Sequence, residues 1–167
     1  KMVANWRPLK DDPAMKVCRI AYLSEAVGLP TDEEVDALAS QASRNNELIG
    51  VTGCLLYSGG NYIQVLEGPC TALMDLFSKI ESDARHTDVR LLLTDEVESR
   101  AFDGWSMGCL NTSKREAIDH QAIGLSVARI KAAHDDEHRA QATLDLLAEF
   151  QSQLPAREQR AAHARAA

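Results

Sequence analysis

Residues 49–68 read IGVTGCLLYSGGNYIQVLEG, and this stretch decides the fold. Two short runs rich in apolar and β-branched residues, 49–57 and 62–67, flank the turn sequence SGGN at 58–61. Glycine and asparagine at the centre of a short connection are typical of a β-hairpin turn. We therefore predict two antiparallel strands joined by this turn.

A strand and a helix are predicted before the hairpin. Residues 16–23 (KVCRIAYL) form a short run of apolar and β-branched residues, which indicates a strand. Thr31 and Glu34 have the spacing of a capping box, so a helix is expected to begin after Thr31. Apolar residues then recur at helical spacing, and the helix is expected to end near Asn45 and Asn46.

A helix and two strands are predicted after the hairpin. Gly68 and Pro69 begin the helix, because proline is favoured in the first turn. Its buried stripe is expected at Leu73, Leu76, Phe77 and Ile80. Strands are then predicted at 89–97 and 104–110, which gives the order β-α-β-β-α-β-β. The first six elements match a ferredoxin-like α+β sandwich, with two helices on one face of an antiparallel sheet.

Two C-terminal helices are predicted beyond this domain. Ser113 and Glu116 form a second capping box for a helix that runs toward Ala133, and Asp135 or Asp136 could cap the next helix. The apolar stripe of the last helix is expected at Leu144, Leu147, Phe150 and Leu154. This stripe either packs back on the sheet or forms a surface for a partner or a second copy.

Composition excludes several classes of function. The 167 residues carry a net charge of -7, which disfavours binding to the phosphate backbone of nucleic acids. No apolar run approaches the roughly 18 residues that a membrane span requires, and no secretory signal is visible in residues 1–15. The cysteines lack metal or redox spacing, so all four are expected to be reduced thiols of a cytoplasmic protein: Cys18, Cys54, Cys70 and Cys109.

A metal site is considered and rejected. His134 and His138 lie at i, i+4 on a predicted helix, which is a spacing that can bind a metal ion. They are flanked by solvated charges in the sequence HDDEH, and no third ligand is evident. We expect no metal.

Two polar residues on strands are more informative. Gln64 lies between Ile63 and Val65, where its side-chain amide costs free energy of desolvation unless it is hydrogen-bonded. Tyr22, on the first strand, also carries a polar group on an apolar ring. From chemistry alone both alternatives stay open: a joint functional role, or a core ring and a solvent-facing amide.

Four segments, in this order, resemble the BLUF family of flavin-based blue-light sensors: CRIAYLS, RNNELIGVTGCLLYSGGNYIQVLEG, DARHTDVRLL and RAFDGWSMG. The resemblance covers about residues 17–110. It includes the strand-one tyrosine, the asparagine pair that ends the first helix, the Q-x-L-E-G strand, the R-H pair after the second helix and the late W-x-M.

The resemblance implies a flavin whose ring lies between the two helices that flank the sheet. By analogy, Tyr22 is the electron and proton donor to the photoexcited flavin, and Gln64 relays the proton between that tyrosine and flavin N5 and O4. Asn46 contacts the polar edge of the ring, and Asn45 is a second contact. The Gln64 side chain is left rearranged by rotation or tautomerisation, and no product forms.

Further residues match family positions near the flavin. These are Ser24, Lys79, Asp83, Arg85 and His86. Lys79 replaces the arginine often found at its position, which puts its contact with the ring edge in doubt. Trp105 and Met107 match the strand thought to carry the signal.

The resemblance implies a photoreceptor that binds FAD, with FMN as an alternative, and is not an enzyme. The expected divisions are a flexible leader or cloning remnant (1–15), a BLUF flavin-binding domain (16–111), a helical extension (112–155) and a frayed tail (156–167). An effector module does not fit in the last ~55 residues, so output is expected through an unidentified downstream protein, and the chain is expected to form a homo-oligomer. Two alternatives stay open: a flavin-free interaction module and a flavoenzyme that works in the dark.

Overall fold

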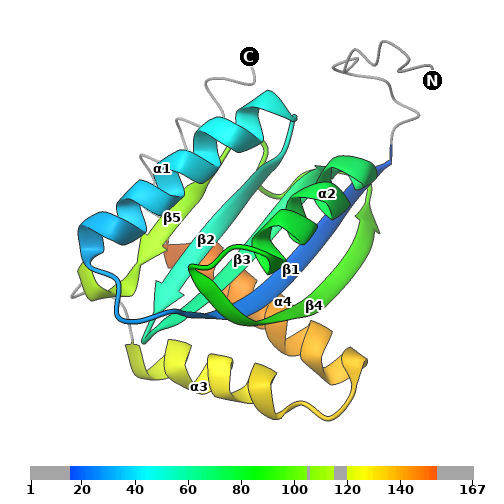
Figure 1. Ribbon diagram of the computed structural model, residues 1–167. Coiled ribbons are helices and arrows are strands. Elements are labelled where there is room, and N and C mark those ends of the chain that lie inside the picture. Colours follow the sequence, from blue (N-terminus) through cyan, green and yellow to red (C-terminus); the bar gives the residue numbers. More distant parts are fainter. Residues whose placement is uncertain (1–15, 105, 115–119, 154–167) are drawn as a thin grey trace.

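The computed structural model describes residues 16–104, 106–114 and 120–153. A five-stranded sheet has helices α1 and α2 on one face and helices α3 and α4 on the other (Figure 1). The elements in chain order are β1 (Val17–Ala26), α1 (Asp32–Leu48), β2 (Thr52–Ser58), β3 (Asn61–Pro69), α2 (Cys70–Glu81), β4 (His86–Val97), β5 (Gly108–Asn111), the short 3-10 helix η1 (Thr112–Lys114), α3 (His120–Ala132) and α4 (Asp136–Gln153).

The sheet has the strand order β4-β1-β3-β2-β5. β1 pairs antiparallel with both β3 and β4, and β2 pairs antiparallel with β3. β5 adds to the edge of the sheet parallel to β2, so the sheet is mixed. The predicted α+β fold of ferredoxin-like order with two C-terminal helices is confirmed.

Helix α1 begins where the capping box predicts. Thr31 Oγ1 accepts a hydrogen bond from the Glu34 backbone N–H, and Glu34 Oε2 accepts one from the Thr31 N–H at 2.7 Å. These two bonds satisfy donors that the first turn of a helix otherwise leaves unpaired. The buried side chains Val35 and Leu38 then pack this helix against β2.

The hairpin β2–β3 requires glycine at its turn and at one point of its ladder. Gly59 and Gly60 have positive φ angles of 54° and 79°, which side chains with a Cβ rarely adopt. At Gly53 a Cβ atom would lie 2.1 Å from the Val65 carbonyl oxygen. The T-G pair of the sequence therefore marks a close approach of two backbones.

Helices α3 and α4 cover the face of the sheet that α1 and α2 leave open. One apolar cluster joins Ile123, Ile130 and Leu146 of these helices to Ala21 and Val65 of the sheet. The two C-terminal helices therefore pack on the sheet, through residues other than those of the expected stripe.

Two details of the extension differ from the sequence-based expectation. Leu144 is exposed, and α4 buries Ala142, Thr143 and Leu146 instead. Ser113 caps no described helix, because it lies within η1 and its hydroxyl donates to Asn111 Oδ1 at 2.6 Å. The side chains of Leu147 and Phe150, together with Glu116 and Leu154, lie outside the described residues. The Asp135 cap is confirmed, since its Oδ1 accepts from the His138 N–H at 2.8 Å.

The expectation of four reduced cysteines is wrong for one pair. Cys18 and Cys70 form a disulfide that joins the start of β1 to the start of α2, with 5.0 Å between their Cα atoms. They are 52 positions apart in the sequence, and pairing of Cys18 with Gly68 across β1 and β3 brings them together. Cys54 and Cys109 are not part of a disulfide.

Strand boundaries shift at the ends of the sheet. β4 begins at His86, because its first residues pair with the end of β1, including Ala26 with His86. β5 begins only at Gly108, so Met107 immediately precedes the strand, and Trp105 lies outside the described residues. Within the described part of the chain, no helix combines the length and apolarity needed to cross a membrane.

Candidate functional site

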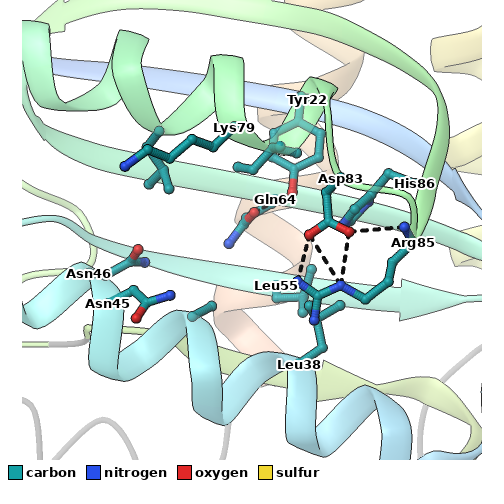
Figure 2. A pocket seen from close by; sticks show the side chains of 13 residues that line it. Tyr22, Leu38, Asn45, Asn46, Leu55, Gln64, Lys79, Asp83, Arg85 and His86 are labelled. Carbon is teal, nitrogen blue, oxygen red and sulfur yellow. Dashed lines mark hydrogen bonds and ion pairs between the residues drawn. The ribbon is translucent and has the colours of Figure 1, made fainter.

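A cavity of about 140 Å³ lies between α1 and α2, above the centre of the sheet (Figure 2). Its apolar walls come from both helices and β2, namely Leu38, Ala42, Leu55, Leu76 and Ile80. Its polar lining is Tyr22, Asn45, Asn46, Gln64, Lys79, Asp83, Arg85 and His86. Eight of the residues selected from the sequence are therefore brought together around one cavity.

Tyr22 and Gln64 form the floor of this cavity. They are direct cross-strand partners of β1 and β3, and the Tyr22 hydroxyl donates a hydrogen bond to Gln64 Oε1. Gln64 Nε2 in turn donates to Met107 Sδ at 3.3 Å. The exposed fractions of Tyr22 and Gln64 are 1% and 5%, so both side chains are removed from water.

The Tyr22 phenol is held in its neutral form. Burial raises the pKa of Tyr22 far above its ordinary value of 10, and the charge of Asp83 adds to this effect. The ring packs against Phe77 of α2, with 5.8 Å between the ring centroids. At neutral pH Tyr22 therefore keeps its proton unless the ring has first lost an electron.

The asparagine pair at the end of α1 is divided between the interior and the rim. Asn46 is buried, and its Nδ2 donates to the Ser106 carbonyl oxygen at 3.0 Å. Asn45 lies at the exposed rim of the cavity. Ser43 Oγ also lies 2.6 Å from Ser106 Oγ, so α1 contacts the segment before β5 at two points.

Arg85 and Asp83 form the mouth of the cavity. Asp83 Oδ1 accepts from both the backbone N–H and Nε of Arg85, each at 2.9 Å, and Arg85 Nη1 donates to Gln41 Oε1 of α1 at 2.9 Å. The hydrogen bonds from Arg85 lower the pKa of Asp83 to about 2. Lys79, exposed in the last turn of α2, also lines the cavity, with its side chain pointing away from Arg85 (Figure 2).

His86 closes the side of the cavity next to Tyr22. Its Nδ1 lies 2.8 Å from Ser24 Oγ, and its ring centroid lies 4.9 Å from that of Tyr62. Burial lowers the pKa of His86, although Asp83 opposes the shift. Ser24 does not line the cavity itself but contacts a residue that does.

This arrangement fits a flat cofactor with a polar edge. The walls from α1 and α2 are apolar, while side-chain amides at the floor and rim offer both donors and acceptors. The Arg85 guanidinium at the mouth suits an anionic group such as phosphate. The isoalloxazine ring of a flavin with its phosphate chain has this chemistry.

One motif of the sequence points to a different chemistry, and the structure does not support it. Residues 104–108 read GWSMG, which has the G-x-S-x-G spacing of a nucleophile elbow. Such an elbow lies between a strand and a helix, whereas this segment leads into strand β5. The Ser106 hydroxyl faces Ser43, with no histidine among its hydrogen-bond partners in the described part of the chain.

Comparison with known proteins identifies the family. The family described as sensors of blue-light using FAD, BLUF, matches residues 17–108. This chain belongs to the BLUF family. The matched residues of this BLUF chain run from the start of β1 to the start of β5 and include every polar residue of the cavity.

Curated BLUF relatives include much longer proteins. The chain is 35% identical over 89 residues to the photoactivated adenylate cyclase subunit beta of Euglena longa, which is 53% of this chain and 10% of that protein. It is 27% identical over 106 residues to the blue light- and temperature-regulated antirepressor BluF of Escherichia coli (strain K12), covering 62% of this chain and 26% of that one. The chain thus spans about a tenth of the length of the first of these relatives.

Solved BLUF structures share the fold over more of the chain. A bacterial light-regulated adenylyl cyclase matches with a TM-score of 0.63 and 30% identity, over 71% of this chain and 34% of that chain. BlrP1 BLUF matches with a TM-score of 0.60 and 33% identity, over 81% and 89% of the two chains. The dark-state structure of the BLUF protein BlrB matches with a TM-score of 0.61 and 25% identity, over 76% and 96%.

Proposed function

We propose that this chain is a blue-light sensor that binds FAD non-covalently between α1 and α2 and reports light through Tyr22 and Gln64. The observation that carries the proposal is the hydrogen bond from the Tyr22 hydroxyl to Gln64 Oε1 on the floor of the cavity. When bound, the flavin supplies absorption of blue light and an excited state that withdraws an electron.

Tyr22 gives up an electron and a proton together. Its raised pKa keeps the phenol neutral in the dark, so no tyrosinate is present to donate an electron alone. Loss of an electron makes a phenol strongly acidic, and the acceptor already in place for its proton is Gln64 Oε1. When the electron returns, Tyr22 regains a proton from the Gln64 side chain.

Gln64 then carries the lasting change. Its amide has one donor end and one acceptor end, and in the dark these face Met107 Sδ and the Tyr22 hydroxyl. Rotation of the amide exchanges the positions of its donor and acceptor ends. A change of tautomer exchanges their roles as donor and acceptor instead. Because a thioether sulfur is a weak acceptor, loss of the bond to Met107 costs little free energy, and the bond to Tyr22 is the stronger restraint on the amide.

The remaining polar residues bind and orient the cofactor. Asn46 and Asn45 face the polar edge of the ring from the end of α1, Lys79 lies beside the ring edge or the ribityl chain, and Arg85 contacts the phosphates at the mouth. Asp83 orients Arg85 through its paired hydrogen bonds. His86, oriented by Ser24, packs beside Tyr22.

FAD is proposed because the family description names it. FMN is the alternative, since one Klebsiella pneumoniae BlrP1 structure is described with FMN. Cofactor released from the purified chain by heat and separated by chromatography distinguishes the two.

The output is proposed to pass to a downstream protein rather than to a reaction on this chain. The chain is proposed to function as a homo-oligomer. Met107 and Trp105 are proposed to relay the signal. Met107 supports this role because it contacts both Gln64 and the apolar clusters under α1 and α2.

An absorption spectrum in the dark and just after blue light tests the proposal. A flavin spectrum that shifts slightly to the red and relaxes back supports it. Bleaching without a shift would contradict the Tyr22–Gln64 relay and favour redox chemistry. Failure to bind flavin after reconstitution with FAD would instead favour an interaction module on the same fold.

A further inference from the structure

Glu67 is a fully buried carboxylate that the cavity does not use. It lies near the end of β3, three residues after Gln64, so its side chain is on the opposite face of the sheet. Arg19 of β1 pairs with it, with Nε and Nη2 at 2.7 and 2.6 Å from Glu67 Oε1. A buried ion pair of this kind is favourable only when the other lone pairs of the carboxylate are also bonded.

Those lone pairs are occupied by the loop that follows β4. The backbone N–H groups of Ala101 and Phe102 donate to Glu67 Oε1 and Oε2 at 3.1 and 2.9 Å. Arg100, the preceding residue, donates to the Glu67 carbonyl oxygen at 3.0 Å and to the Gly50 carbonyl oxygen at 2.8 Å. We call Glu67, Arg19, Arg100, Ala101 and Phe102 the Glu67 cluster.

The same loop connects the two faces of the sheet. Phe102 is buried in the apolar cluster that contains Ile123 and Leu146 of α3 and α4. A few residues later, Met107 lies on the other face, where its sulfur accepts from Gln64. Gln64 and Glu67 of a single strand therefore bond to the two ends of one short stretch, 101–107.

We propose that Glu67 is a positioning residue for the light response, which sets where Met107 meets Gln64 and couples that contact to Phe102 and helix α3. The coupling to light rests on the proposed function. Charge-assisted hydrogen bonds are stronger than the amide–thioether bond at the other end, so a change at Gln64 displaces Met107 while Phe102 stays attached. Because the Glu67 end stays bonded to β3, the displacement is transmitted to Phe102, whose side chain packs in the same apolar cluster as Ile123 of α3.

A matched pair of variants separates positioning from simple stabilisation. Glu67→Gln and Arg19→Gln both remove the ion pair. Only Glu67→Gln also weakens the attachment of the loop, because its amide nitrogen is a donor and every partner of Glu67 is a donor. Arg19→Gln leaves the buried carboxylate without its cation, which lowers the free energy of unfolding, but the carboxylate still accepts from both backbone N–H groups of the loop.

Hydrogen exchange of the FAD-reconstituted full chain in the dark tests the positioning directly. Glu67→Gln is expected to raise exchange in residues 106–111 by about fivefold, the effect of losing one hydrogen bond, and Arg19→Gln by less than about twofold. An equal rise in both variants would overturn the proposal and leave Glu67 a purely structural residue.

The light-induced difference in exchange tests the coupling. Glu67→Gln is expected to keep the flavin and the red shift but to lose most of the light-induced change in α3, which Arg19→Gln keeps. A full change in α3 in Glu67→Gln would overturn the coupling. A wild-type chain without any red shift would instead contradict the proposed function, while the dark measurement still decides the positioning.

If Glu67→Gln does not fold, Arg100→Gln provides the same test from the other side of the loop. This change removes donors to the carbonyl oxygens of Glu67 and Gly50 without leaving a buried charge unpaired. The same rise in exchange at 106–111 is expected, and its absence counts against the proposal.

Discussion

Tyr22 and Gln64 lie directly opposite each other on β1 and β3, and the hydroxyl of the first donates to the side-chain oxygen of the second. The register of the two strands therefore sets the geometry of the relay. Antiparallel partners cannot shift by one residue without moving one of these side chains to the other face of the sheet. The sheet therefore fixes where both side chains begin, and only the end of the Gln64 side chain is left to rearrange.

Replacement of Gln64 by Leu is expected to keep the flavin and abolish the light-induced red shift. Leucine has a similar volume and extends the apolar lining of the cavity, but it can neither accept from Tyr22 nor donate to Met107. The light-minus-dark difference spectrum checks this. A shift of wild-type size in Gln64→Leu would exclude Gln64 as the relay.

Replacement of Tyr22 by Phe removes the hydroxyl and keeps the buried ring. The red shift is expected to be lost, because no donor of a coupled electron and proton remains next to Gln64. The free energy of unfolding is expected to fall by about 1–3 kcal/mol, since Gln64 Oε1 loses its buried donor. Urea denaturation measures the second effect, and a red shift that survives in this variant speaks against the first.

The buried His86 side chain is expected to make the free energy of unfolding smaller at mildly acidic pH. Burial lowers its pKa below the value of 6.5 expected in the unfolded chain, so below that pH the unfolded chain binds more protons. This contribution to the free energy of unfolding is complete above pH 6.5 and decreases as the pH falls toward the folded pKa. Urea denaturation at pH 7.5 and at several more acidic values measures it.

The control for this pH effect is the exposed His138, whose pKa is raised by its hydrogen bond to Asp135, so its contribution has the opposite sign. His86→Gln should remove the decrease in stability between these pH values, whereas His138→Gln should retain it or make it steeper. Equal pH profiles for His86→Gln and the wild type would show that His86 is not its source.

Replacement by alanine is expected to have opposite effects on stability at two glycines. Gly53→Ala places a Cβ 2.1 Å from the Val65 carbonyl oxygen, so β2 and β3 must separate, at a cost of about 1–3 kcal/mol. Gly124→Ala adds a Cβ in α3 with no atom of another element within 4 Å, and it should stabilise the protein by roughly 0.5–1 kcal/mol. Thermal unfolding of both variants checks the prediction, which is wrong if the two midpoints move in the same direction.

Features that depend on near neighbours in the chain were predictable from the sequence. The capping box at Thr31 and Glu34 is made entirely within four residues, and both of its bonds are present. The turn between β2 and β3 is likewise specified by its own glycines and by Asn61, whose side chain donates to the carbonyl oxygens of Ser58 and Gly59.

The buried face of α4 could not be obtained in this way. Helical spacing alone favoured the stripe that includes Leu144, yet the helix buries Thr143. This is possible because the Thr143 hydroxyl donates to the Arg139 carbonyl oxygen at 2.8 Å, so a polar residue is buried with its hydrogen bond satisfied. Leu144 is left with 38% of its surface exposed.

The residues that gather at the site could not be predicted from local sequence patterns, because they are far apart in the chain. Asn45, Gln64 and Arg85 meet at one cavity only because the sheet brings their elements together, and the family resemblance supplied this set. Glu67 had a visible signal, since an acidic residue between Leu66 and Gly68 in an apolar strand requires a partner. That partner, Arg19, is 48 residues away.

The Cys18–Cys70 bond closes a covalent ring that contains α1, β2 and β3, and therefore both halves of the relay and one wall of the cavity. Cleavage by a reducing agent leaves the sequence unchanged but frees the start of α2, the helix that carries Lys79. Reduced and oxidised preparations of this chain therefore differ in the covalent restraint on this wall of the cavity. Any property measured on the cavity should therefore be given together with the redox state of Cys18 and Cys70.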